Sequence, residues 1–363
     1  MHRTGRLGCR GLDGRAVERL RRPVRAVSGR SPRTVTGVGP VDLLVVMDPL
    51  LGCDTVSDTT IGLMAASLER GHRVLHCTAG DLSLIGSRVV ARATTVDQGD
   101  LIGPGTGPGA GAGPGGSDLQ AQTVDLAAVD AVLVRSDPPV DSAYLAMTLL
   151  LEHARGETLI VNDPRGLREA NEKLYACRFP ELMPATVVTA DAAVLADFAE
   201  EHGTIVLKPL DGHGGRGVCL LRAGDAGASE LMAARTGDGR YQVMAQEFLP
   251  GVYDGDRRIL LLDGEPLGAL RRRPSEGEFR ANIGLGGQVD VVDLDDRDRR
   301  IIDTLAPALR ADGLYFVGID VIDGRLSEIN VTSPTGLRQL AHLSGTRPDL
   351  AVVEWLEERV GRP

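Results

Sequence analysis

Aromatic side chains are scarce in this chain of 363 residues, which has 5 Phe, 5 Tyr and 1 Trp although 42% of it is hydrophobic. The core must therefore rest on Val, Leu, Ile and Ala, the residues that buried parallel strands and their covering helices supply. This composition favours a globular α/β protein. The length indicates two or three domains.

Cysteine patterns and long apolar runs are also missing. The five cysteines are widely spaced, with no CxxC pair and no Cys/His cluster of zinc-binding spacing. We interpret them as reduced, mostly buried thiols of a cytoplasmic protein. No apolar run is long enough for a signal peptide or a membrane span. The net charge of −10 disfavours nucleic acid or an anionic membrane as the main partner, although a local basic patch would still bind phosphates.

Two stretches have compositions that are atypical of a packed domain. Residues 1–38 are Arg-rich, and we expect a disordered extension, for which a wrongly assigned start site is one explanation. A targeting segment is the less favoured alternative, because Asp13, Glu18 and the lack of an amphipathic period do not suit a transit peptide. Residues 103–116 (GPGTGPGAGAGPGG) are expected to form a flexible surface insertion.

Strand-like and helix-like segments alternate between residues 41 and 161. Apolar runs predict strands at 41–47, 73–76, 131–135 and 158–161. Helical periodicity predicts helices at 61–70 and 144–155. This order of elements predicts a small open parallel sheet with helices on its faces.

A glycine-rich loop follows a later strand. The run 204–210 is apolar except for Lys208 near its end, and the sequence DGHGGRG follows directly at 211–217. Glycines let backbone N–H groups approach an anion closely, so this loop is a candidate phosphate cover. Taken alone, the glycines are better explained as an ordinary turn. The P-loop order is absent, because the lysine precedes the glycines.

A hairpin near the C-terminus is the candidate metal site, with strands predicted at 316–322 and 325–331. A two-residue loop would put Glu328 and Asn330 on the apolar face, whereas a three-residue loop with a bulge at Gly324 opposes Asp320 to Glu328. The hydrophobic pattern selects the second register, in which all three polar side chains share one face. Oxygen ligands without His or Cys are typical of magnesium, and solvated carboxylates are the alternative explanation.

Eight motifs follow one another between about residues 41 and 357. They are MDP (47–49), RSDPP (135–139), NEKL (171–174), LKPLDGHGG (207–215), MAQEFLPG (244–251), DGDRR (254–258), RANIGLGG (280–287) and FVGIDVIDGRLSEINVTSPTG (316–336). Together they resemble bacterial glutathione synthetase of the ATP-grasp superfamily. The resemblance implies an ATP-grasp fold preceded by an open parallel α/β domain. It also implies a substrate-side domain at 39–165, a lid subdomain at 166–245 and a catalytic subdomain at 246–363.

The resemblance implies nucleotide-binding roles for residues in three of these motifs. Lys173 and Lys208 match the lysines that hold the ATP phosphates. The loop that covers the phosphates includes Gly212, Gly214 and Gly215. The segment that lines the adenine is Gln246, Glu247, Phe248 and Leu249. For each lysine alone, a solvated charge is the simpler explanation, but it is weaker for Lys208, because an unpaired ammonium inside an apolar strand is costly.

Metal and substrate roles are implied in the same way. Asp320, Glu328 and Asn330 match ligands of Mg²⁺, with Mn²⁺ as the alternative ion. Arg258, Arg280 and Asn282 match residues near the γ-phosphate and the acyl intermediate. Arg135 matches a substrate-side arginine, although an ordinary residue at a strand end is its simpler explanation. His213 and Arg216 are bulkier than the usual residues of the family's loop, and Ser136 stands where a basic residue is common.

The implied activity is ATP-dependent ligation of glycine to γ-glutamylcysteine through an acyl phosphate, which gives glutathione, ADP and phosphate. The implied partners are these small molecules, and the implied assembly is a homo-oligomer, a dimer or a tetramer. A ligase for another acid and amine is the nearer alternative, because loops build the substrate pocket. A non-catalytic ATP-binding protein is the farther alternative, disfavoured by the presence of both lysines and all three metal ligands.

Overall fold

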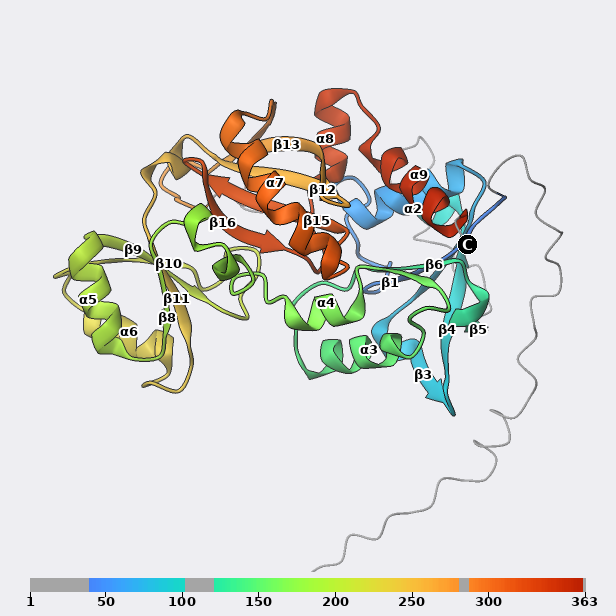
Figure 1. Ribbon diagram of the computed structural model, residues 1–363, viewed down its shortest axis with the longest axis horizontal. Helices are drawn as coiled ribbons and strands as arrows, with labels where there is room; N and C mark the ends of the chain where they lie inside the picture. Colours follow the sequence, from blue (N-terminus) through green and yellow to red (C-terminus); the bar gives the residue numbers. More distant parts are fainter. Residues whose placement is uncertain (1–38, 102–120, 281–286, 362–363) are drawn as a thin grey trace, which may run out of the picture.

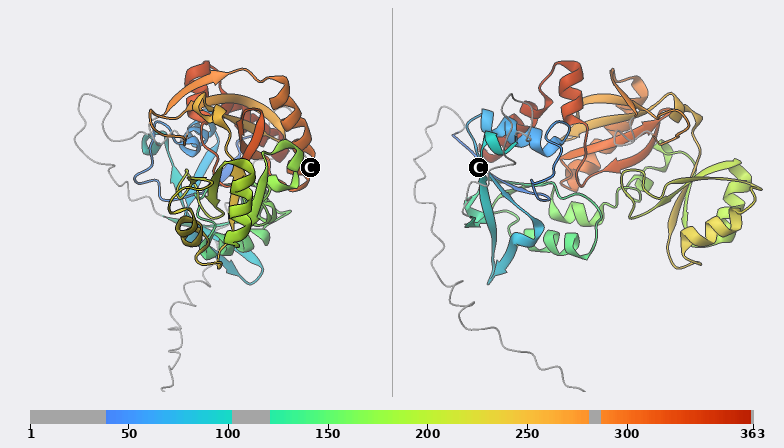
Figure 2. Two further views of the ribbon diagram at one scale, coloured as in Figure 1. Left: turned by 90° about the vertical axis from the view of Figure 1, so that its left-hand side faces the viewer. Right: turned by 180° about the vertical axis from the view of Figure 1, so that it is seen from behind.

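The computed structural model describes residues 39–101, 121–280 and 287–361. The expected extension at 1–38, the expected insertion at 103–116 and Asn282 therefore lie outside the described residues. Within these ranges the chain forms three β-sheets with helices packed on them (Figure 1). The first sheet lies at one end of the molecule, the four-stranded sheet at the other end, and the five-stranded sheet between them (Figures 1 and 2).

The first sheet has the strand order β3-β4-β2-β1-β6-β7, with β5 paired to β4. Its strands are β1 Asp42–Val46, β2 Arg73–Cys77, β3 Leu82–Ile85, β4 Arg88–Val96, β5 Gln122–Asp125, β6 Ala131–Val134 and β7 Leu159–Val161. All four predicted strands are present and run parallel. The sheet as a whole is mixed, because β3, β4 and β5, which the sequence patterns do not predict, add antiparallel pairs at one edge.

Three helices of this region are α2 Thr59–Glu69, α3 Ser142–Glu152 and α4 Pro164–Glu169. Each is preceded by an aspartate whose carboxylate accepts backbone N–H bonds of the first turn, namely Asp58, Asp141 and Asp163. Such a cap stabilises a helix by about 1 kcal/mol. The C-terminal helix α9 (Pro348–Gly361) packs beside α2, so the chain ends against its own N-terminal sheet (Figure 1).

The four-stranded sheet is antiparallel, with the order β10-β9-β11-β8 and a hydrophobic core of its own. Its strands are β8 Thr186–Thr189, β9 Thr204–Pro209, β10 Cys219–Arg222 and β11 Val243–Glu247. Helices α5 (Ala192–His202) and α6 (Ala228–Thr236) lie together on this sheet (Figure 1). The predicted strand at 204–210 is β9, and the glycine loop connects it to β10. The predicted boundary between residues 245 and 246 falls inside β11, and the division into subdomains stays a proposal.

The five-stranded sheet is antiparallel, with the order β14-β13-β12-β15-β16. Its strands are β12 Asp256–Leu262, β13 Glu265–Arg273, β14 Gln288–Val292, β15 Phe316–Ile322 and β16 Arg325–Asn330. Helix α7 (Asp296–Ala311) packs on one face, where Ile301 and Leu305 share a core with Val317 and Ile319. Helix α8 (Leu337–Ser344) follows β16 and a connecting loop. The apolar face of the β15–β16 hairpin is thus buried, as predicted.

The turn of the β15–β16 hairpin differs from the prediction. Ile322 pairs with Arg325, so the loop holds two residues, Asp323 and Gly324, and both have positive φ. The predicted three-residue loop with a bulge at Gly324 is wrong. The Asp-Gly pair instead forms a tight turn with positive φ at both central positions, the conformation that this dipeptide favours in hairpins.

The predicted pairing of Asp320 with Glu328 is nevertheless present, because a bulge lies elsewhere. Val321 pairs with Leu326, and Ser327 is the extra residue of β16. A bulge changes the direction of a side chain and shifts the register by one residue. It therefore returns Glu328 to the polar face, and Ser327 contributes to the same cavity.

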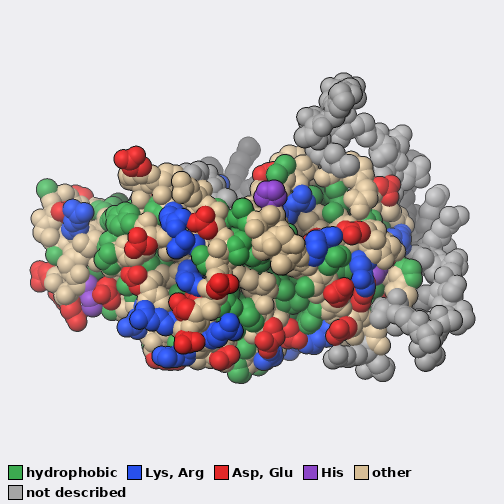
Figure 3. Space-filling view, turned by 90° about the horizontal axis from the view of Figure 1, so that it is seen from above, with side chains coloured by type: hydrophobic (Ala, Val, Ile, Leu, Met, Phe, Trp, Pro, Cys, Tyr) green, Lys and Arg blue, Asp and Glu red, His purple; other side chains and the backbone are tan. Residues whose placement is uncertain are grey.

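The outer surface gives few further indications of partners. On the face shown in Figure 3, acidic and basic side chains are interspersed, so the net negative charge is not gathered there. Across residues 39–101, 121–280 and 287–361, no helix is long and apolar enough to cross a membrane.

Candidate active site

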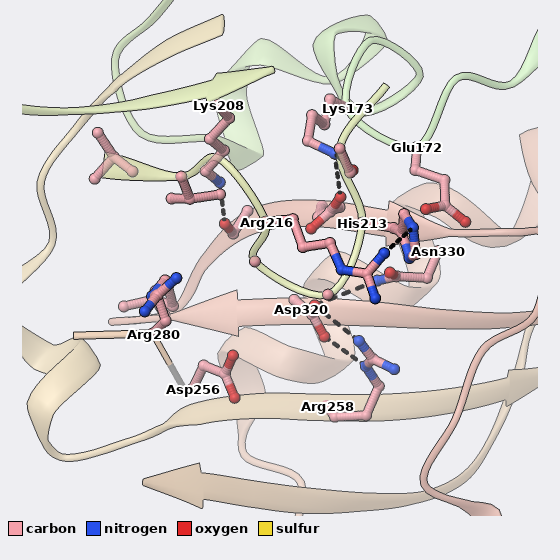
Figure 4. A pocket seen from close by; sticks show the side chains of 18 of the residues that line it. Glu172, Lys173, Lys208, His213, Arg216, Asp256, Arg258, Arg280, Asp320 and Asn330 are labelled. Carbon is pink, nitrogen blue, oxygen red and sulfur yellow. Dashed lines mark hydrogen bonds and ion pairs between the residues drawn. The ribbon is translucent and has the colours of Figure 1, made fainter. Parts of the chain in front are cut away.

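A cavity of ≈ 570 Å³ lies between the four-stranded and the five-stranded sheet (Figure 4). It is lined by every predicted site residue in the described part of the chain except Arg135: Lys173, Lys208, Gly212, Gly214, Gly215, Gln246, Glu247, Phe248, Leu249, Arg258, Arg280, Asp320, Glu328 and Asn330. These residues come from six separate motifs of the sequence, and the fold brings them together around one cavity.

The two predicted phosphate lysines reach the cavity from different elements. Lys208 extends from β9, and its Nζ donates to Ser327 Oγ at 2.8 Å. Lys173 donates through Nζ to the carbonyl of Gly212 at 2.6 Å and to Glu328 Oε1 at 2.9 Å. Burial is the largest cause that lowers the pKa of Lys208, with Lys173 adding to it and Glu328 opposing it. Both ammonium groups are placed to neutralise a polyanion.

Two arginines and two aspartates form a buried charge cluster on the five-stranded sheet. Arg258 donates to both oxygens of Asp320, at 2.6 and 3.0 Å. Arg272 donates to both oxygens of Asp256, at 2.7 and 2.6 Å, and also lies 3.0 Å from Asp320 Oδ1. Burial opposes ionisation of Asp320, but the two arginines outweigh it and hold the pKa of this carboxyl well below its usual value. Burial, the largest cause, raises the pKa of Asp256, although Arg272 opposes it.

The candidate metal ligands meet on the polar face of the hairpin. Asp320 and Glu328 are directly opposed, and Asn330 Nδ2 donates to the carbonyl of Gly318 at 3.1 Å and to Asp320 Oδ2 at 3.3 Å. The amide oxygen of Asn330 is thereby left for another partner. The described residues hold no cluster of three His, Cys, Asp or Glu side chains arranged for a metal, so a cation here depends on this amide as its third ligand. The set of oxygen donors fits a hard divalent cation.

The candidate adenine segment begins with Gln246 and Glu247 at the end of β11 and continues into the residues after it. Gln246 is buried and donates through Nε2 to Thr186 Oγ1 at 3.2 Å. The N–H groups of Glu247 and Phe248 donate to the carbonyls of Ala185 and Thr204. A hydrogen bond from this segment to a nucleotide must therefore use other backbone groups, while the Phe248 and Leu249 side chains supply apolar surface.

The structure does not bring Arg135 to the cavity. Its side chain is buried, with Nε donating to Thr60 Oγ1 at 3.1 Å and Nη2 donating to the carbonyl of Pro334 at 2.9 Å. The guanidinium also lies over the Phe316 ring, 5.4 Å from its centroid. Burial lowers the pKa of Arg135 to about 10. Arg135 is thus hydrogen-bonded to the loop after β16 without lining the cavity itself, whereas Pro334 of that loop does line the cavity.

Among the cavity residues that are absent from the predicted set, Glu172, Asp256, Arg272 and Ser327 bond to one another, to predicted residues or to the loop after β16. Glu172 Oε1 accepts from the N–H of Val331 and from the N–H and hydroxyl of Thr332. Burial, reinforced by Glu328, raises the pKa of Glu172. Only Asp256 had a local signal, because it alternates with Arg258 and must share its face of the strand.

The comparisons with known sequences cover most of the chain. The N-terminal domain of prokaryotic glutathione synthetase matches residues 41–168, and the ATP-grasp domain of the same enzyme matches residues 172–345. The chain belongs to the prokaryotic glutathione synthetase family. It is 43% identical over 320 residues to the glutathione synthetase of Synechocystis sp., covering 87% of this chain and 99% of the relative. It is 46% identical over 301 residues to that of Parasynechococcus marenigrum, covering 83% and 94%.

Solved structures show the same fold at lower identity. A D-cycloserine synthetase, DcsG, has a TM-score of 0.61 at 18% identity, covering 88% of this chain and 99% of that one. The ATP-grasp ligase PsnB, complexed with a minimal precursor, Mg and ADP, has a TM-score of 0.54 at 19% identity, covering 88% and 98%. Family membership makes the chain a ligase of the ATP-grasp type, which forms a C–N bond and uses ATP with a divalent metal.

Proposed function

We propose that this chain joins glycine to γ-glutamylcysteine with ATP, giving glutathione, ADP and phosphate. The observation that carries the proposal is that the family match includes the N-terminal domain at 41–168 as well as the ATP-grasp domain at 172–345. The relatives are 40–46% identical over most of their length. Similarity restricted to nucleotide binding would not extend over both domains.

The cavity supports a mechanism through an acyl phosphate. A carboxylate is too poor an electrophile to acylate an amine, so its oxygen first bonds to the γ-phosphorus while the bond to ADP breaks. The amine then attacks the acyl carbon, and phosphate leaves. Lys173 and Lys208 would neutralise the phosphate charge, with Arg258, Arg280 and Asn282 near the γ-phosphate. No enzyme nucleophile is required.

The metal is proposed to be Mg²⁺, held by Asp320, Glu328 and Asn330. When bound, it would neutralise phosphate charge and polarise the phosphoryl oxygens. The side chains suit this role because all three offer oxygen donors on one face of the β15–β16 hairpin. Mn²⁺ accepts the same ligand set and is the alternative ion.

A ligase for another acid and amine is the second candidate. The fold is shared with DcsG and PsnB, so the same nucleotide site serves other ligases. An ADP-release screen over acid and amine pairs separates the candidates. We expect release with γ-glutamylcysteine and glycine. Release should be about hundredfold slower when alanine replaces glycine, because a pocket selective for glycine would exclude the added methyl group. Release with some other pair, but never with this one, would replace the proposal.

The proposed location is the cytoplasm, and the proposed assembly is a homo-oligomer. A cytoplasmic location suits the cysteines, since those in the described residues, Cys53, Cys77, Cys177 and Cys219, are free thiols. A homo-oligomer, a dimer or a tetramer, is proposed from the family resemblance. Light scattering of the purified protein would measure the assembly directly.

A further inference from the structure

The loop between β9 and β10 carries an arginine that the mechanism above does not use. Arg216 lines the cavity, and its side chain points from the loop toward the side that carries Asp320 and Asn330 (Figure 4). Its Nη1 lies 3.4 Å from Nε2 of His213. Because a guanidinium only donates, Nε2 of His213 is the atom that would accept in this contact. The backbone N–H of Arg216 also donates to the carbonyl of His213 at 3.1 Å, so one turn fixes the two side chains together.

Arg216 differs from the other arginines of the cavity, because it forms no ion pair with any described residue. Arg258 and Arg272 pair with aspartates, and Arg280 pairs with Glu278. An unpaired guanidinium beside the site of a nucleoside triphosphate can bind two phosphate oxygens at once, which is the arrangement in which its planar fork binds best. The chemistry that Arg216 fits is therefore that of a phosphoryl group.

The backbone of the loop keeps Arg216 close to this site. A Cβ on Gly212 would lie 2.7 Å from Pro209 Cγ and 2.9 Å from the carbonyl of Arg216, so only glycine allows the tight return of the loop. The carbonyl of Gly212 in turn accepts from Lys173 Nζ at 2.6 Å. Arg216 is thus carried on a loop that a phosphate-binding lysine holds.

We propose that Arg216 is a further catalytic residue that binds the γ-phosphoryl group during transfer, and that His213 is a positioning residue that orients the guanidinium. During transfer the carboxylate oxygen bonds to the γ-phosphorus as the bond to the β-phosphate oxygen breaks. Arg216 stabilises the charge on the remaining γ-oxygens and exchanges neither proton nor electron. The inference rests on the proposed function only in requiring ATP as the phosphoryl donor.

Equilibrium binding of ADP and of the β,γ-imido analogue of ATP, each with Mg²⁺, tests the contact without acid or amine. We expect Arg216→Ala to weaken binding of the analogue about tenfold and to leave ADP binding unchanged, since only the analogue has a γ-phosphoryl group. In turnover, kcat should fall about a hundredfold for Arg216→Ala, and Arg216→Lys should restore it only in part. Arg222→Ala, an exposed arginine on β10 outside the cavity lining, is the matched control and should change neither quantity.

The His213 variants test orientation. His213→Gln keeps an acceptor and should retain most of kcat, whereas His213→Ala should lose more of kcat than of apparent affinity for ATP. The inference would be overturned if Arg216→Ala and the wild type bound the analogue equally and had kcat values within twofold of each other. Matching melting temperatures would show that both proteins are folded. If instead analogue binding depends on Arg216 but the wild type makes no glutathione, the proposed substrates are wrong and this contact stands.

Discussion

At the scale of single residues, Glu328 connects the proposed metal site with the proposed phosphate site. It opposes Asp320 across the hairpin and accepts from Lys173 at 2.9 Å. Glu328→Gln keeps the shape and removes the charge, so we expect ADP release to fall at least about a hundredfold, or roughly 2.7 kcal/mol in transition-state stabilisation. Asn330→Ala should act alike. The control is Glu265→Gln, because Glu265 is an exposed glutamate that pairs with Arg310. Near-normal ADP release by folded Glu328→Gln would remove this residue from the metal site.

Lys208 predicts a pH dependence of nucleotide affinity. Burial lowers its pKa below the 10.5 of a free lysine. The ammonium is charged below this lowered pKa and neutral above it, so ATP binding should weaken as pH rises, by up to about tenfold per pH unit. Lys208→Arg stays protonated throughout and should show a flatter profile. The test is to measure the ATP dissociation constants of the wild type and of Lys208→Arg from neutral to alkaline pH. Parallel pH profiles for the two proteins would contradict the role of Lys208 ionisation.

The glycine loop gives a prediction at the scale of elements. Arg216 is the single Lys or Arg between Pro209 and Leu221, so trypsin cleavage inside the loop has one site. We expect a nick after Arg216 in the nucleotide-free protein and protection by ATP with Mg²⁺, because phosphates bind the loop and order it. Mass spectrometry of timed digests measures the nick. Cleavage at the same rate with and without nucleotide would count against a loop that closes on phosphates.

Arg135, directly after β6, links helix α2 to the loop after β16. Its guanidinium bridges Thr60 Oγ1 and the carbonyl of Pro334. Arg135→Lys keeps the charge but cannot span both partners, so we expect the free energy of unfolding to fall by about 2 kcal/mol and the KM values to rise. The control is Arg92→Lys, because Arg92 is an exposed arginine of β4. Urea unfolding gives the comparison, and unchanged stability for Arg135→Lys would show that the bridge is dispensable.

The hairpin shows what local patterns can predict about elements. Alternation of apolar residues correctly opposes Asp320 to Glu328, because every other register would bury polar groups. The turn was predicted wrongly, because a two-residue turn plus a bulge at Ser327 gives the same pairing as a longer loop. Nothing local marks Ser327 as the bulge, although its hydroxyl accepts from Lys208.

Long-range contacts explain the remaining omissions. The Asp256–Arg272 pair requires the register of β12 against β13, which contains an irregularity of its own. The partner of Arg135 at Pro334 lies 199 residues away in sequence. Family resemblance named residues on both sides of the cavity. It also matched Arg135 to a substrate-side arginine, because motifs carry no information about which side of a loop a side chain reaches.

The site exists at the scale of the whole molecule only where two sheets face each other. The four-stranded sheet contributes Lys208 and the glycine loop, and the five-stranded sheet contributes the charge cluster and the proposed metal ligands. Glu172 lies in the connection between the N-terminal sheet and the four-stranded sheet, and it is hydrogen-bonded to residues 331 and 332 beyond β16. Closure of the two sheets on the nucleotide would exclude water from an acyl phosphate.

Isotope transfer tests the proposed reaction most directly. γ-Glutamylcysteine carrying ¹⁸O in both oxygens of its cysteinyl carboxylate is incubated with glycine, ATP and Mg²⁺. Mass spectrometry then measures the ¹⁸O content of the phosphate and of the glutathione. Because the carboxylate oxygen that bonds to phosphorus leaves with it, we expect one ¹⁸O in the phosphate and one in the glutathione for each ADP formed. Unlabelled phosphate, or ADP formed without glutathione, would contradict the proposed ligation through an acyl phosphate.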